Sequence, residues 1–321
     1  MYVRKNLRAS FVWRQYAWRP LVIFAAYDAF ICLLYGPLNI RWLDIPWQPV
    51  ALLGTAVAFY IGFKNNGSYD RFWEGRQIWG SIVNTSRFWT LQAFDFIRDA
   101  PGDYTLSPDE LRETHRRLVY RQVAWCNALR LHLRRQTAEY WQTDVVPFLL
   151  DPADRDLATV ANPPAHLLRQ QSREILGLNQ NGLLTEYRHV AMMETIQDLF
   201  NTQGACERIK NTPFPRQYAF FSYFFVWIFA ALLPLGLVEE FDHRVALGPY
   251  HVWLLVPFAA VVSWVYNTIE RVGHRSEDPF DNQENDVPIT AICRSIEIDL
   301  RQLLGEDRLP QPVRPVEDVL Y

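Results

Sequence analysis

Residues 50–76 read VALLGTAVAFYIGFKNNGSYDRFWEGR and pass from an uncharged apolar segment into a polar, aromatic and charged one without an obvious helix breaker. We expect one helix that leaves a lipid bilayer while still helical and so links membrane and cytosol. Residues four apart lie on nearly the same side of a helix. The apolar part therefore sorts into two neighbouring stripes. The small-residue stripe is Gly54, Ala58 and Gly62, and the aromatic stripe is Thr55, Phe59 and Phe63.

Each stripe has two interpretations. Small residues let helices approach closely in lipid, where packing drives association. The aromatic stripe would then lie at a helix interface or around a pore. Ordinary helix packing also explains both stripes, and spacing alone leaves the choice open.

Four apolar segments are long enough to cross a membrane. Residues 217–238 form an uncharged run of 22 residues, sufficient for a hydrocarbon core of about 30 Å. Residues 247–269 contain no Asp, Glu, Lys or Arg and have Trp and Tyr side chains suited to the interfaces. The predicted spans are residues 20–40, 47–64, 217–238 and 247–269.

The first span contains an acidic residue, Asp28. An ionisable group in a span is expected to face protein or water rather than lipid. A carboxylate satisfied by a neighbouring helix is favoured over a role in ion passage.

Basic residues predict the orientation. Five of them precede the first span with no acidic residue between, which places the N-terminus in the cytoplasm; they are Arg4, Lys5, Arg8, Arg14 and Arg19. Four spans return the C-terminus to the same side. We expect residues 1–321 to form a single unit, with cytoplasmic helical parts at 65–216 and 270–308. Residues 309–321 are rich in proline and predict an extended or disordered tail.

The first cytoplasmic part is expected to be helical. Ser107, Pro108 and Glu110 form a capping-box start for a helix that runs to about Gln136. Asn162 begins a second helix through Leu176. A third follows Gly182 and is expected to end near Gly204. The prolines of residues 211–216 predict a break before the third span.

Enzyme motifs are absent from the sequence. It has no GxxxxGK, GxGxxG, HExxH or GxSxG pattern, and its histidines fall at no recurring metal spacing. We therefore expect neither an enzyme nor a cofactor. The net charge of −3 gives no support to nucleic-acid binding. Reduced thiols are expected at the four scattered cysteines, Cys32, Cys126, Cys206 and Cys293.

Residues 277–288 are dense in oxygen-bearing side chains, which are ligands for a hard cation such as calcium. The segment lacks the spacing and central glycine of an EF-hand loop, and Pro279 and Pro288 indicate a rigid connector. Both interpretations stay open. The ion-site residues would be Asp278, Asp281, Glu284 and Asp286.

Long stretches of the chain match a known pattern. The run GFKNNGSYDRFWEGRQIWGSIVN follows the second span, Pro-Phe-Pro precedes the third, and SEDPFDNQENDVPITAICRSIEIDLRQLL follows the fourth. With four spans and both ends inside, this pattern resembles the bestrophin family, most closely its bacterial branch. The resemblance extends from about residue 14 to residue 304.

The resemblance implies an all-α membrane protein that assembles as a homopentamer around a central pore, in the inner membrane of a bacterium. Its partners would be further copies of itself, membrane lipids and permeant ions. The family's three neck positions fall on Thr55, Phe59 and Phe63. The outermost is usually a large apolar residue, and threonine is smaller and hydroxylated, so the neck is expected to be shorter or wetter there.

Ion selectivity is left open by the sequence. Aromatic edges are electropositive and faces electronegative, so edge-on rings would favour anions and face-on rings cations. The family at large favours an anion channel for ions such as chloride. A cation-selective sodium channel of the same architecture and a non-conducting membrane scaffold or sensor are the alternatives.

The resemblance also bears on how the channel opens and on a second, cytoplasmic constriction of the pore. Animal members bind calcium at an acidic run that corresponds to residues 281–286. Amides at Asn282, Gln283 and Asn285 stand here where carboxylates would be expected, which argues against calcium gating. The family's second constriction would lie in the helix after Gly182.

Overall fold

The computed structural model describes residues 1, 3, 11, 13–97, 106–243 and 251–321. Within them the secondary structure is helical, apart from an isolated bridge between Val316 and Val319. The predicted all-α class is therefore confirmed. The chain forms two compact units. The membrane unit is Arg4–Arg71 with Pro213–Glu277, and the extramembrane unit is Met1–Val3 with Phe72–Thr212 and Asp278–Tyr321.

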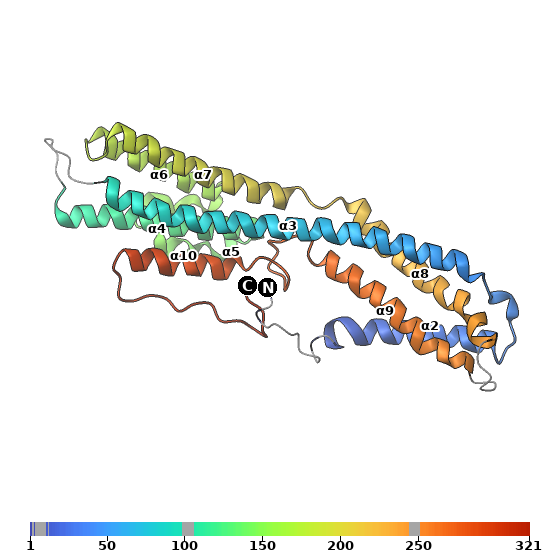
Figure 1. Ribbon diagram of the computed structural model, residues 1–321. Helices are drawn as coiled ribbons and strands as arrows, with labels where there is room; N and C mark the ends of the chain where they lie inside the picture. The colour runs from blue at the N-terminus through green and yellow to red at the C-terminus, as the bar shows by residue number, and fades with distance from the viewer. Residues whose placement is uncertain (2, 4–10, 12, 98–105, 244–250) are drawn as a thin grey trace. The chain divides into compact units, whose positions relative to one another are not determined.

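Helix α3, Trp47–Phe96, is a single helix of 50 residues. At 1.5 Å per residue it is about 75 Å long, more than twice the hydrocarbon thickness of a bilayer. Figure 1 shows it as one unbroken ribbon. The prediction that the second span continues as a helix beyond the membrane is confirmed.

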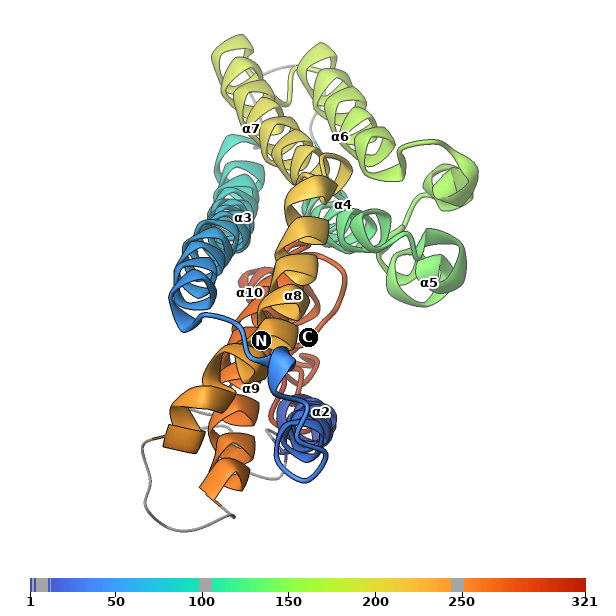
Figure 2. The same cartoon turned by 90° about the vertical axis from the view of Figure 1, so that its right-hand side faces the viewer.

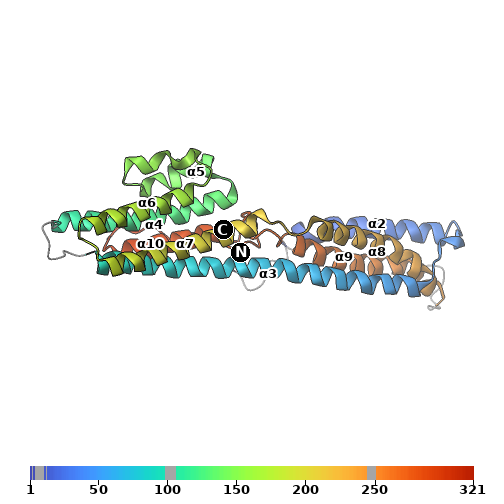
Figure 3. The ribbon, with the colours of Figure 1, turned by 90° about the horizontal axis from the view of Figure 1, so that it is seen from above.

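The membrane unit contains three further long helices, α2 (Trp18–Tyr35), α8 (Arg216–His243) and α9 (Leu255–His274). Helices α8 and α9 lie beside one another and against the first part of α3, and α2 packs on α9 and α8 (Figures 2 and 3). Short segments precede or join them: η1 (Trp13–Ala17), η2 (Arg41–Leu43) and η5 (His251–Leu254). An apolar core holds the unit together and includes Cys32, Val57, Phe229 and Leu255.

Four candidate spans are present among the described residues, as predicted: Trp18–Tyr35, Arg41–Phe96, Arg216–Asp242 and His251–His274. The first ends at Tyr35 rather than at residue 40, because Pro37 disfavours helical backbone at the preceding Gly36. The fourth extends to His274, beyond the predicted residue 269. Arg4, Lys5, Arg8 and the first residues of the predicted fourth span lie outside the described residues.

The extramembrane unit is built around α4, Pro108–Arg134, most of whose residues are buried. Four tryptophans, Trp79, Trp89, Trp125 and Trp141, are buried in its core. The other elements of this unit are α5 (Thr137–Asp144), η3 (Val146–Phe148), η4 (Pro152–Thr159), α6 (Pro163–Gln180), α7 (Glu186–Asn211) and α10 (Ile289–Leu303).

The helix starts predicted from capping residues are confirmed. The Ser107 hydroxyl accepts from the Glu110 N–H, and the Glu110 carboxylate accepts from the Ser107 N–H at 2.8 Å. Asn162 caps α6 by accepting from the Ala165 N–H at 3.1 Å. These bonds satisfy backbone donors that a helix start leaves unpaired.

Two predicted helix ends are wrong. Helix α6 continues to Gln180, and α7 continues through Gly204 to Asn211. Glycine inside a helix costs only about 1 kcal/mol. Buried side chains on both sides of Gly204, Leu199 and Cys206, hold α7 against the core and outweigh that cost.

The C-terminal tail is extended and held at its end. The Tyr321 carbonyl accepts from the Ala291 N–H at 2.8 Å, in the first turn of α10. The Leu320 N–H donates to the Met1 carbonyl at 2.8 Å, and Val319 is buried. The two chain ends therefore lie together in the extramembrane unit (Figure 1).

Candidate functional site

The aromatic stripe lies on an uncovered face of α3. Phe59 and Phe63 are 67% and 75% exposed, and Thr55 is also exposed. The Thr55 hydroxyl donates to the Ala51 carbonyl at 3.0 Å, so its hydrogen bond stays within the helix. The opposite face of α3 is buried through residues such as Val57 and Ile61. The structure thus places all three predicted neck residues on one side of the helix.

The small-residue stripe divides into two parts. A methyl group added at Gly54 would lie 2.6 Å from Cε2 of Phe229, so Gly54 permits a close approach of α8. The Tyr266 hydroxyl donates to the Gly54 carbonyl at 3.2 Å and adds a contact from α9. Ala58 and Gly62 are exposed, and a methyl group added at Gly62 would meet no atom within 4 Å. Only Gly54 therefore serves packing within the chain.

Gly54→Ala is expected to destabilise the membrane unit by about 1–3 kcal/mol, because the new methyl group overpacks the contact with Phe229. Thermal unfolding of the purified protein measures the loss. Gly177→Ala in α6 is the control, since no atom lies within 4 Å of its added methyl group. An equal melting temperature for Gly54→Ala and the unsubstituted protein would contradict the close approach.

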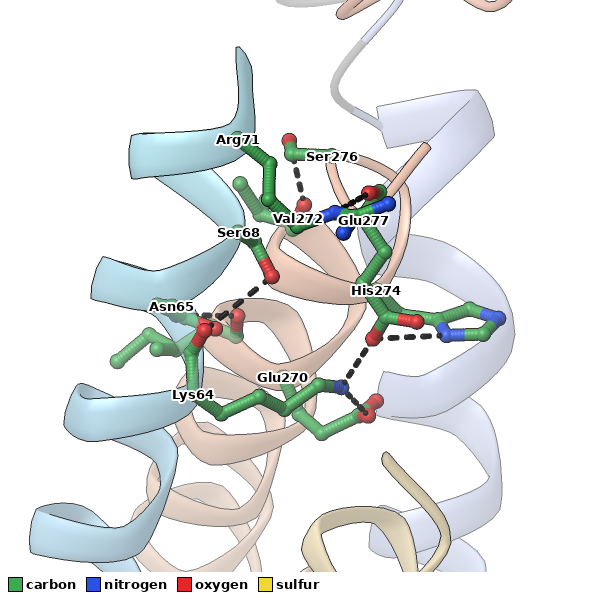
Figure 4. A network of polar contacts seen from close by, with 10 residues as sticks. Lys64, Asn65, Ser68, Arg71, Glu270, Val272, His274, Ser276 and Glu277 are labelled. Atoms are coloured by element: carbon green, nitrogen blue, oxygen red, sulfur yellow. Dashed lines mark hydrogen bonds and ion pairs between the residues drawn. The ribbon is translucent and has the colours of Figure 1, made fainter. Parts of the chain in front are cut away.

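A buried polar network surrounds Lys64, the residue after Phe63 (Figure 4). The Lys64 side chain is fully buried, and its Nζ lies 3.0 Å from Oε1 of Glu270 and 3.0 Å from Oε1 of Glu277. Nδ1 of His274 lies 3.3 Å from the same Glu277 oxygen. Two buried carboxylates thus surround one ammonium group directly below the aromatic stripe.

Further bonds tie this part of α3 to the end of α9. The Asn65 side chain donates to the Ile269 carbonyl at 3.0 Å, and Nε of Arg71 donates to the Glu277 carbonyl at 2.8 Å. A methyl group added at Gly273 would lie 1.7 Å from Oδ1 of Asn65, so the two helices touch there. This part of α3 is therefore held in place on one side while the aromatic stripe remains uncovered.

The ionisation of Glu277 fits its place in the network. Burial alone would raise its pKa, but hydrogen bonds from His274 and Lys64 outweigh burial and hold the pKa below its usual value. Glu277 is therefore ionised at neutral pH and compensates the buried Lys64 charge. Sequence reasoning missed this network. The available signal was that Lys64 and Glu270 are the first charged residues after the second and fourth apolar segments.

Asp28 differs from its prediction. It is buried in α2, but neither carboxylate oxygen has a hydrogen-bond partner among the described residues. The expectation of a carboxylate satisfied by another helix is therefore wrong for the single chain. Phe24, one helical turn before Asp28, belongs to an apolar cluster with Ala230 and Ala260.

The four predicted ion-site residues do not converge. Among the described residues, no three His, Cys, Asp or Glu side chains are placed to hold a metal ion. Asp281 forms an ion pair with Lys210, and Oδ2 of Asp286 accepts from the Gln283 N–H at 2.9 Å. Asp278 and Glu284 also have interaction partners. An ion site here stays a prediction.

The same segment has the packing of a rigid connector. The Val287 N–H donates to the Pro279 carbonyl at 3.0 Å and closes the loop. Phe280 is buried, and a methyl group added at Gly75 would lie 3.1 Å from its ring. Phe280 thus anchors the segment on α3 within the extramembrane unit.

Asp286→Asn is expected to stabilise the protein at pH 7.5. Burial raises the pKa of Asp286 from 3.8 to about 6, so its stabilising contribution is present below pH 3.8 and is lost as the pH rises through about 6. Asparagine does not titrate and should gain up to about 3 kcal/mol at pH 7.5, with the gain vanishing near pH 4.

Melting temperatures of both proteins across this pH range, with and without calcium, measure the effect. Asp109→Asn is the control, because Asp109 is exposed, paired with Arg112 and outside this segment. A gain that persists at pH 4 would contradict the titration. Stabilisation by calcium that Asp286→Asn abolishes would support an ion site.

The four cysteines are buried free thiols. Burial raises the pKa of Cys293 to about 11 and raises that of Cys126 as well. Both therefore stay protonated and unreactive at neutral pH.

Residues 7–302 match the family described as Bacterial/Fungal Bestrophin protein. The chain belongs to the bestrophin family. This bestrophin is 30% identical over 318 residues to the voltage-dependent anion channel-forming protein YneE of Escherichia coli O157:H7, covering 96% of this chain and 95% of that protein. It is 32% identical over 290 residues to the voltage-dependent anion channel-forming protein RSc3414 of Ralstonia nicotianae, covering 87% and 85%.

A solved structure shows the same fold. The crystal structure of a bacterial bestrophin homologue from Klebsiella pneumoniae superposes with a TM-score of 0.75 at 25% identity, covering 90% of this chain and 98% of that one. This bestrophin is therefore an all-helical, multi-pass membrane protein and not an enzyme.

Proposed function

We propose that this bestrophin forms a homopentameric channel that passes small ions, namely anions such as chloride. Thr55, Phe59 and Phe63 of each subunit would line its hydrophobic neck. The observation that carries the proposal is the uncovered aromatic stripe on a transmembrane helix whose other side is buried.

The exposed face continues beyond the apolar segment. Asn66 and Asp70 are exposed and lie seven residues after Phe59 and Phe63, which is two turns along the same side of α3. A face that turns from aromatic to polar as the helix leaves the membrane is suited to a path for hydrated ions. A lipid-facing stripe would explain the phenylalanines but not their alignment with this polar continuation.

One α3 helix cannot enclose a pore, so the proposal requires several copies with their stripes facing a common axis. The family resemblance gives the number as five. Ala58 and Gly62 would allow close contact between neighbouring α3 helices, since both are exposed in the single chain. In an assembly of this kind the two phenylalanines would face the pore and not the lipid, and the pore at this level could hold water or exclude it.

The relatives support an anion as the permeant ion, because YneE and RSc3414 are both named voltage-dependent anion channel-forming proteins. Edges of Phe59 and Phe63 turned towards the axis would favour anions. The cation-selective sodium channel and the non-conducting scaffold are the competing functions. We place the protein in a bacterial inner membrane with both termini cytoplasmic, supported by the pairing of Met1 with Leu320.

Reversal potentials of the purified protein in planar bilayers under asymmetric salt test the proposal. A reversal potential near the chloride equilibrium potential is the expected result. A value near the cation equilibrium potential would contradict the anion channel and support the cation-selective sodium channel. The non-conducting scaffold would be favoured if no ion flux is measured and electron microscopy shows an assembly without an axial path.

A further inference from the structure

A cavity of about 390 Å³ lies in the membrane unit, lined by residues of α2, α8 and α9. Its lining includes Arg19 at the start of α2, Ala219 near the start of α8 and His274 at the end of α9. These positions belong to one end of the three spans. The cavity therefore lies where apolar helix surface gives way to charged residues, at the level of lipid headgroups.

Basic side chains outnumber carboxylates in the lining of the cavity. Arg19 and Arg271 contribute two guanidinium groups. The one carboxylate of the lining, Glu270, is bound to Lys64 at 3.0 Å, and His274 is bound to Glu277 at 3.3 Å. Guanidinium groups bind phosphate oxygens in pairs of charged hydrogen bonds, which makes this end of the cavity suitable for a phosphate.

The rest of the lining is apolar and aromatic. Ile23 and Tyr223 both line the cavity and are about half exposed, so apolar surface continues along the spans. Trp227 also lines it, and the Nε1–H of this indole has no hydrogen-bond partner among the described residues. Aromatic rings of this kind typically lie at the headgroup level of a membrane.

We propose that this cavity binds an anionic phospholipid. The headgroup phosphate would lie against Arg19 and Arg271, and an acyl chain would follow Ile23 and Tyr223 along the spans. Charge complementarity favours an anionic lipid over a zwitterionic one, whose own cation would meet the two arginines. Glu270 and His274 belong both to this cavity and to the Lys64 network, so a bound headgroup would adjoin the contacts that hold α3.

Native mass spectrometry of the purified protein, titrated with phosphatidylglycerol or phosphatidylcholine, tests the proposal. The protein is expected to bind phosphatidylglycerol at least about tenfold more tightly, which corresponds to 1.4 kcal/mol. Arg19→Gln combined with Arg271→Gln should abolish this preference. Arg216→Gln is the matched control, since Arg216 is an exposed arginine at the start of α8 outside the cavity lining.

Three outcomes would overturn the lipid site. These are equal binding of the two lipids, an unchanged preference in the double variant, and displacement of phosphatidylglycerol by equimolar glycerol phosphate, which would show a site for soluble phosphate. Arg19 is exposed, so Arg19→Gln alone should fold even where the change at Arg271 does not. It should reduce the preference, and an unchanged preference there would also count against the site.

Discussion

Replacing Phe59 and Phe63 together by alanine should raise ion flux through the reconstituted protein by at least about tenfold. The two rings are the largest apolar groups of the uncovered stripe on α3. In the proposed neck they exclude water, and removing them lets the constriction hydrate, which lowers the barrier to ion entry. Because both side chains are exposed in the single chain, their loss leaves no cavity in its core.

Single-channel recording and liposome flux measure this effect. Phe220→Ala with Phe224→Ala is the matched control, because these are also exposed phenylalanines four residues apart on a span, in α8. The control pair should leave the flux unchanged. Equal flux in the neck variant and the unsubstituted protein would contradict the assignment of Phe59 and Phe63 to the pore.

Lys64→Met should lower the stability of the membrane unit by about 3–5 kcal/mol. The substitution leaves Glu270 and Glu277 buried with their shared cation gone. Glu277 keeps its contact with His274, but both buried carboxylates lose the ammonium group that compensated their charge, and they also repel one another. The melting temperature should fall by about 10 °C.

Two comparisons isolate the cause of that loss. Adding Glu270→Gln and Glu277→Gln to Lys64→Met removes the unpaired charges and should recover much of the stability. Arg208→Met breaks the exposed ion pair with Glu74 and should cost less than about 1 kcal/mol. A small loss for Lys64→Met, comparable to that for Arg208→Met, would show that the network contributes little.

Local signals accounted for the helices of this protein. The capping box at Ser107, the Asn162 cap and the unbroken pattern from Trp47 onward all predicted elements that the structure contains. They succeeded because caps and apolar runs act within a few residues of the backbone they affect. The end of α7 was misjudged at Gly204, since a weak local preference was overruled by side chains buried on either side.

Contacts between distant residues could not be inferred in the same way. In the sequence, Lys64 and Glu270 are only charged residues that follow apolar segments, and no spacing rule connects positions 206 residues apart. Their pairing depends on how α3 and α9 pack, which includes the close approach at Gly273. The unpartnered Asp28 and the paired Asp281 were likewise decided by what the fold brings to each carboxylate.

The sequence by itself determined the four spans, the helix that extends beyond the membrane, and the stripe of Thr55, Phe59 and Phe63, because helical periodicity assigns each residue to a side of its own helix. Periodicity does not say which side is covered. The tertiary structure decided that the aromatic stripe is open, that Gly54 faces Phe229, and that Lys64 is buried between two carboxylates. Those outcomes depend on packing between helices far apart in sequence, because that packing decides which side chains are buried and which charged groups have a partner of opposite charge.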